Sequence, residues 1–127
     1  MNIVGLGTHV MECVRVRKLI DKHADKFIGE VYTPEEAAYC RARTHSTEFY
    51  AAVWAAKEAV FRSLGMKWQR GVDWRDVVIE CESPIAPRAT VRGATEERMK
   101  ARGVSRVLVS FSYSRSFATA TAIAVRG

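Results

Sequence analysis

Apolar positions recur along this chain with two different periods, which divide it into a helical first half and a largely β second half. Asn2 to Leu6 is a short apolar run that predicts a buried strand leading into Gly7 and Thr8. Apolar residues then recur at helical spacing at positions 10, 13, 14, 16, 19 and 20, and arginines and lysines occupy the opposite face. We therefore expect an amphipathic helix with a cationic side to follow the first strand.

Two further helices are predicted by their end signals. Thr33-Pro34-Glu35-Glu36 combines an N-cap residue, a proline at the first helical position and a glutamate that closes a capping box, and this helix should end near Arg43. A longer helix should begin at Ser46 or Thr47 and stop at Gly65, a residue suited to the position just past a helix end. Positions 53, 56, 60 and 64 give the long helix an apolar face.

The second half of the chain is dominated by strand patterns. The expected elements are strands at Val77 to Glu82 and Arg88 to Arg92, a short helix at Thr95 to Arg102 closed by Gly103, and strands at Arg106 to Ser112 and Phe117 to Val125 joined by a hairpin turn over 113–116. This order predicts the α+β class, with an antiparallel sheet packed against one long helix. At 127 residues, we expect one domain spanning 1–127.

The net charge and the cysteine positions limit the classes of protein to which this chain can belong. The formal net charge of +6 favours a polyanionic partner, which can be nucleic acid, a phosphorylated small molecule or an acidic protein. No apolar run is long enough to span a membrane. Cys13, Cys40 and Cys81 lie far apart and form neither a disulfide pattern nor a zinc motif. We expect a cytoplasmic protein with no membrane association.

Three short segments carry the candidate chemistry, and their order and spacing resemble a known family. They are Gly5-Leu6-Gly7-Thr8-His9, Trp54-Ala55-Ala56-Lys57-Glu58-Ala59 and Ser110-Phe111-Ser112-Tyr113. In these segments the chain resembles the holo-acyl-carrier-protein synthase branch of the 4′-phosphopantetheinyl transferases. The resemblance covers nearly the whole chain, including Thr33-Pro34 at a helix start and the strand from Pro87 to Val91. Its Lys-Glu-Ala core is the most specific part.

The resemblance implies a transferase that moves 4′-phosphopantetheine from coenzyme A to a serine of an acyl carrier protein, converting the apo form to the holo form. It also implies Mg²⁺, with Mn²⁺ as an alternative, a homotrimer with active sites between subunits, and a place in fatty acid biosynthesis. Attack of a serine hydroxyl on a pyrophosphate requires neutralisation of phosphate charge and removal of a proton. By resemblance, Glu58 and Lys57 would be the catalytic residues. Glu58 would bind the metal and assist proton removal, while Lys57 and Arg62 would hold phosphates.

The resemblance assigns two binding surfaces as well. Ser110, Ser112 and Tyr113 would face coenzyme A across a subunit boundary, although Tyr113 can equally be a turn aromatic with no ligand role. The cationic face of the first helix, formed by Arg15, Lys18 and Lys22, would receive the acidic surface of the carrier protein. A solvated helix face without a partner is the alternative for these three residues.

Two positions depart from the family pattern. The metal-binding aspartate of the family is His9 here, and the histidine that ends the third motif is Tyr113. Neutral imidazole is a poor ligand for Mg²⁺, which prefers oxygen. Three accounts stay open. In the first, Mg²⁺ is held by Glu58, pyrophosphate and water, and His9 contacts at most a bound water. In the second, Glu12, one helical turn further on, supplies an oxygen. In the third, the ion is softer, such as Mn²⁺ or Zn²⁺, or is absent.

Two other functions remain as alternatives. The altered residues allow a catalytically degenerate paralogue that still binds coenzyme A or a carrier protein. The positive charge allows a small nucleic-acid-binding protein, but lysines and arginines are spread along the chain and no aromatic-basic RNA-binding motif is present, which disfavours nucleic acid as a partner.

Overall fold

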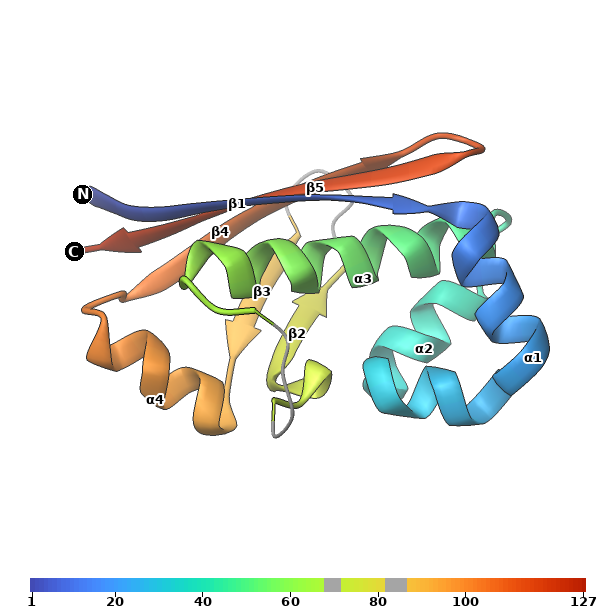
Figure 1. Ribbon diagram of the computed structural model, residues 1–127, viewed down its shortest axis with the longest axis horizontal. Coiled ribbons are helices and arrows are strands. Elements are labelled where there is room, and N and C mark those ends of the chain that lie inside the picture. Colours follow the sequence, from blue (N-terminus) through green and yellow to red (C-terminus); the bar gives the residue numbers. More distant parts are fainter. Residues whose placement is uncertain (68–71, 82–86) are drawn as a thin grey trace.

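The computed structural model describes residues 1–67, 72–81 and 87–127, and it confirms the expected α+β architecture (Figure 1). In these residues a sheet of strand order β1-β5-β4-β3-β2 has antiparallel neighbours throughout. The long helix α3 lies along the sheet, with α1 and α2 near one end of α3 and α4 near the other. The elements in chain order are β1 (Asn2–Glu12), α1 (Cys13–Val31), α2 (Pro34–Arg41), α3 (Ser46–Ser63), the 3₁₀ helix η1 (Trp74–Asp76), β2 (Val77–Glu80), β3 (Arg88–Val91), α4 (Gly93–Ala101), β4 (Arg106–Tyr113) and β5 (Phe117–Arg126).

Helix α3 is the centre of the core. Its predicted apolar face is fully buried at positions 53, 56, 60 and 64, and it packs chiefly against β1 and β5. Both α3 and β5 bury rows of alanines, and such small side chains let a helix approach a sheet closely. Gly5 of β1 continues this theme, because a Cβ atom placed on it would lie 2.1 Å from the carbonyl oxygen of Ser63. The Gly-x-Gly segment therefore serves close packing of β1 on the α3 backbone.

The first strand is longer than its sequence pattern predicts. β1 continues to Glu12 because it pairs with β5 over almost its whole length, from Asn2 opposite Arg126 to Glu12 opposite Phe117. The sequence pattern predicted a helix from position 10. Hydrogen bonds with β5, a strand more than 100 residues away, hold residues 10–12 in the extended conformation instead. Helix α1 begins only at Cys13, and it is kinked at Ala24, whose φ of 43° falls in the left-handed half of backbone space.

Local end signals predicted the other helices well. Thr33 and Glu36 form the expected capping box at the start of α2, which ends at Arg41 rather than near Arg43. Gly65 takes the left-handed conformation expected after α3, with a φ of 72°. The β4–β5 hairpin is confirmed. Residue 82, the last of the strand predicted from Val77, lies outside the described residues. Across the described ranges, no helix combines the length and apolar character needed to cross a membrane.

Candidate active site

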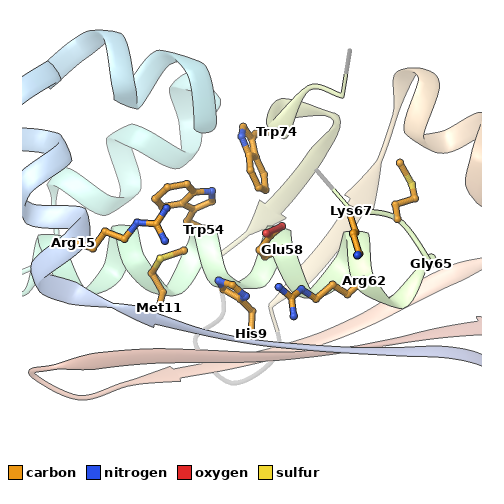
Figure 2. A pocket seen from close by; sticks show the side chains of 10 residues that line it. His9, Met11, Arg15, Trp54, Glu58, Arg62, Gly65, Lys67 and Trp74 are labelled. Carbon is orange, nitrogen blue, oxygen red and sulfur yellow. The ribbon is translucent and has the colours of Figure 1, made fainter. Parts of the chain in front are cut away.

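An open cavity of about 810 Å³ lies between β1, α1, α3 and the η1 segment, and we call it the β1–α3 cavity. Figure 2 shows His9, Glu58 and Arg62 near its centre, with Arg15 at one end and Lys67 at the other. Its remaining wall is mainly apolar and includes two tryptophans and two methionines, namely Met11, Trp54, Met66 and Trp74. Several cations therefore surround a single carboxylate, which suits a ligand that carries several negative charges.

Glu58 presents its carboxylate to the cavity without a partner among the residues that the structure describes. No ion pair or hydrogen bond of this carboxylate occurs within the described part of the chain, although Arg62 lies one helical turn further along α3. Burial raises the pKa of the Glu58 carboxyl above its ordinary value, and the positive charges of Arg62 and Arg15 oppose that shift. Its oxygens are thus available to a ligand or a cation.

His9 lies beside this carboxylate as the sequence predicts. It projects from β1 on the same side as Met11, two residues further on, so both line the β1–α3 cavity. Burial lowers the pKa of His9, and the nearby charges of Arg62 and Arg15 lower it further. Both effects favour the neutral form of the imidazole. The structure brings together two of the three candidate metal ligands from the sequence analysis, His9 and Glu58.

The prediction that Glu12 replaces the missing metal ligand is wrong. Residue 12 lies in a strand rather than one helical turn after His9, and residues three apart in a strand point to opposite faces. Glu12 lines a different cavity, of about 390 Å³, together with Arg17 and Phe117. The extended conformation of positions 10–12 is the physical reason for the error.

Lys57 also departs from its predicted role. Its side chain is 0% exposed and does not line the β1–α3 cavity. Its ammonium group lies 2.7 Å from the Glu36 carboxylate and donates to the carbonyl oxygens of Trp74 and Val77. Consecutive helical residues differ by about 100° in direction, so Glu58 faces the cavity while Lys57 faces the core. The expectation that Lys57 holds a phosphate is contradicted by this placement.

Among the lining residues that sequence reasoning missed are Lys67 and Trp74. Lys67 lies two residues beyond Gly65, where the left-handed turn redirects the chain, and it reaches the cavity from there. Trp74 forms part of the opposite wall, in edge-to-face contact with Trp54 and with Phe61. Neither residue lies in a periodic segment, so only the path of the chain after α3 reveals them.

The third motif does not meet the other two within one chain. Ser110 and Ser112 are exposed on β4, and their neighbours Val109 and Phe111 pack against the core. The serines therefore project from the sheet face away from α3. Tyr113 lines a separate cavity of about 350 Å³ and packs on Phe49 with ring centroids 5.6 Å apart.

The structure places the three cationic residues predicted for one face of α1 in two different environments. Arg15 lines the β1–α3 cavity and places its guanidinium carbon 5.7 Å from the centroid of the Trp54 ring, a cation–π geometry. Lys18 and Lys22 follow at helical spacing and are exposed to solvent outside that cavity. Only Arg15 can therefore contact a ligand in the cavity.

The fold and the cavity together define an α+β protein with a cationic site, built around one free carboxylate, for a polyanionic ligand. A sequence profile described as the 4′-phosphopantetheinyl transferase superfamily matches residues 5–122. The chain belongs to this family and is an enzyme of the phosphopantetheinyl transferase type.

Full-length relatives agree with this assignment. The holo-[acyl-carrier-protein] synthase of Chlamydia felis is 34% identical over 125 residues, which cover 98% of this chain and 99% of the relative. That of Chlamydia caviae is 36% identical over 123 residues, covering 97% and 98%. The crystal structure of the Neisseria meningitidis holo-[acyl-carrier-protein] synthase superposes with a TM-score of 0.86 at 26% identity, covering 98% and 100% of the two chains. A Bacillus anthracis holo-(acyl-carrier-protein) synthase in complex with CoA (3′,5′-ADP) superposes with a TM-score of 0.78 at 25% identity, covering 98% of each chain.

Proposed function

We propose that this protein transfers 4′-phosphopantetheine from coenzyme A to a serine of an acyl carrier protein. The observation that carries the proposal is the Glu58 carboxylate, which has no partner among the described residues and shares one cavity with Arg15, Arg62 and Lys67. Such a cavity suits the pyrophosphate of coenzyme A, whose negative charge requires several cations. The names of the relatives support the two substrates, and coenzyme A is bound in one of the solved structures.

The residues of the cavity fit Mg²⁺ as an ion shared with the substrate. Mg²⁺ is commonly held by one or two carboxylates together with substrate phosphates and water. Glu58 offers one free carboxylate, and no group of three or more metal-ligating side chains occurs among the described residues. Neutral His9 suits contact through a bound water better than direct ligation of Mg²⁺. When bound, the ion would neutralise charge that develops on the phosphate oxygens.

The chain's own residues would bind the reacting groups and manage the proton. Arg62 and Lys67 would hold phosphate oxygens, which lowers the cost of the charge that develops as the serine attacks. Glu58, directly or through a bound water, would assist removal of the serine proton. The tryptophan wall makes one side of the cavity apolar, which would strengthen these charge interactions relative to a fully solvated surface.

A homotrimer with shared active sites is part of this proposal. The outer side of the sheet carries exposed apolar side chains, including Leu6 and Val10 of β1 at 63% and 60% exposure and Leu108 of β4 at 45%. β1 is also an edge strand of the described sheet, and such apolar edges favour association. Covering this side with further copies would place Ser110 and Ser112 where they can contact coenzyme A bound to a neighbour. Light scattering at micromolar concentration would show a trimer for the wild type, and a monomer would contradict this part of the proposal.

The exposed lysines of α1 support docking of an acidic carrier protein. Lys18 and Lys22 lie outside the β1–α3 cavity on the same helix as Arg15, so a partner bound there would bring its serine to the cavity edge. The net charge of +6 would assist its approach.

Intact-mass measurement tests the transfer directly. Incubation with coenzyme A, Mg²⁺ and an apo-acyl carrier protein should increase the carrier mass by one phosphopantetheinyl arm. An unmodified carrier together with calorimetric binding of coenzyme A would instead indicate a degenerate paralogue. A salt-dependent shift of RNA without carrier modification would indicate the nucleic-acid-binding alternative.

A further inference from the structure

A buried ion pair lies directly behind the β1–α3 cavity. Glu36 of α2 and Lys57 of α3 have side-chain exposures of 1% and 0%, and the Lys57 ammonium lies 2.7 Å from Oε1 of Glu36. Lys57 is next to Glu58 in sequence, and its partner comes from a different helix. Burying both charges is costly unless their remaining hydrogen-bonding capacity is satisfied.

Every charged atom of this pair has a partner. The Lys57 ammonium also donates to the carbonyl oxygens of Val77 at 2.7 Å and Trp74 at 3.3 Å. Oε1 of Glu36 accepts the backbone N–H of Thr33 at 2.8 Å, and Oε2 accepts that of Ile79 at 2.7 Å. The pair therefore ties together the start of α2, the middle of α3, η1 and β2.

This network holds one wall of the cavity. Trp74 is the first residue of η1, its carbonyl is bonded to Lys57, and its ring packs edge-to-face on Trp54 and lines the cavity. The Lys57 bonds therefore join the backbone at the start of η1 to α3, in addition to the ring contacts of Trp74 with Trp54 and Phe61 of α3.

We propose that Glu36 and Lys57 are positioning residues for substrate binding, which act by anchoring the Trp74 wall of the β1–α3 cavity to α3. The proposal rests on the proposed transfer from coenzyme A for its kinetic readout. Lys57 influences the substrate through the Trp74 backbone and makes no contact with phosphate. Glu36 lies outside the motif from Trp54 to Ala59, 21 residues before Lys57, and acts on the cavity through the same network.

Stability and positioning can be separated with a neutral replacement of the pair. Single variants leave one buried charge without compensation and should unfold at markedly lower temperature. The double variant Glu36→Gln/Lys57→Met removes both charges at similar volume, and its amide oxygen can still accept one of the two backbone N–H groups that bond Glu36, so we expect it to melt at a higher temperature than either single variant. It nevertheless lacks the ammonium bonds to Trp74 and Val77. We expect it to lose about tenfold in kcat/KM, mainly through a higher KM for coenzyme A.

A double-mutant cycle with Trp74→Ala identifies the route of the effect. If the pair acts through the Trp74 wall, introducing the neutral pair into the Trp74→Ala variant should reduce kcat/KM little further. Losses that multiply would show that Lys57 contacts the substrate by another route and would overturn the proposal. Wild-type kinetics in the neutral-pair variant would show a purely structural role. Tyr32→Phe, which removes a buried hydrogen bond to the Tyr50 carbonyl of α3, is the matched control and should leave KM unchanged.

Hydrogen exchange provides a readout that needs no transfer activity. The neutral-pair variant should speed amide exchange in residues 72–77 about tenfold or more relative to Tyr32→Phe. Unchanged exchange there would overturn the anchoring role even if the protein proved to have another activity. If the neutral pair does not fold, Glu36→Asp takes its place: it is shorter by one methylene and draws the Lys57 ammonium away from the Trp74 carbonyl, so we expect changes in KM and exchange in the same direction but smaller. Absence of transfer by the wild type with faster exchange in the variant would contradict the proposed function alone.

Discussion

Gly7 of β1 lies so close to Ala59 of α3 that a Cβ atom placed on Gly7 would be 2.0 Å from the Ala59 carbonyl oxygen. This contact between backbones locks the strand that carries His9 against the helix that carries Glu58. The distance between the two candidate site residues is therefore set by the absence of a side chain at position 7.

We expect Gly7→Ala to lower the free energy of unfolding by about 3 kcal/mol, because the added methyl must push apart two backbone segments. Urea denaturation measures the change. Gly29→Ala is the matched control, since an added Cβ at Gly29 in α1 meets nothing within 4 Å. In a helix this control should stabilise by about 0.5 to 1 kcal/mol. Equal destabilisation by the two variants would contradict the close-packing role of Gly7.

Replacing Glu58 by glutamine should reduce transfer at least about 100-fold, or roughly 2.7 kcal/mol in barrier, because the negative charge is lost while the volume is kept. Steady-state transfer to apo-carrier protein measures the effect. Glu12→Gln makes the same chemical change in the other cavity and should retain nearly full activity. If Glu58→Gln kept more than about a tenth of the rate, the assignment of Glu58 would be wrong.

The same Glu58→Gln change should stabilise the ligand-free protein at neutral pH. Burial raises the pKa of Glu58 in the folded state, so the folded protein binds this proton more tightly than the unfolded chain does. The protonated Glu58 therefore contributes its full stabilisation of the wild type below the pKa of this residue in the unfolded chain. That contribution is lost as pH rises through the pKa of Glu58 in the folded protein. Thermal melting from pH 4 to 8 should show the melting temperature of the variant increasing relative to that of the wild type as pH rises. A constant difference in melting temperature would contradict the shift.

His9→Asp should lower the Mg²⁺ concentration for half-maximal transfer by about tenfold, or roughly 1.4 kcal/mol, because an aspartate adds a charged oxygen ligand beside Glu58. Titrating both proteins with Mg²⁺ and Mn²⁺ measures the change. Identical Mg²⁺ dependence would exclude a weakened magnesium site. A wild type that works better with Mn²⁺ or Zn²⁺, with the advantage reversed in His9→Asp, would instead indicate direct binding of a softer ion by the imidazole.

Charge reversal on α1 should separate the two substrates. Lys22→Glu should raise the KM for carrier protein by about fivefold, roughly 1 kcal/mol, and leave that for coenzyme A unchanged, because Lys22 lies outside the cavity. Arg15→Glu should raise both, since Arg15 lines the cavity. Steady-state kinetics with each substrate varied in turn makes the comparison. Effects of Lys22→Glu on both substrates would contradict its assignment to a docking face.

The sequence determined the features that depend on local interactions. The α2 capping box formed by Thr33 and Glu36 and the turn at Gly65 are satisfied by residues within a few positions of one another. The burial of α3 followed from its apolar spacing, and Glu58 and His9 were found through the resemblance of their motifs. These predictions required no knowledge of which distant segments meet.

Tertiary structure decided the rest. β1 extends to Glu12 because β5 supplies its hydrogen bonds, and that extension turns Glu12 away from His9. Lys57 is buried because Glu36, Trp74 and Val77 converge on its ammonium, which no pattern around position 57 reveals. The elements that pack around a helix decide which of its sides faces a ligand and which side faces a charged partner. Local spacing fixes the angle between Lys57 and Glu58, but only the fold decides which of the two reaches the cavity.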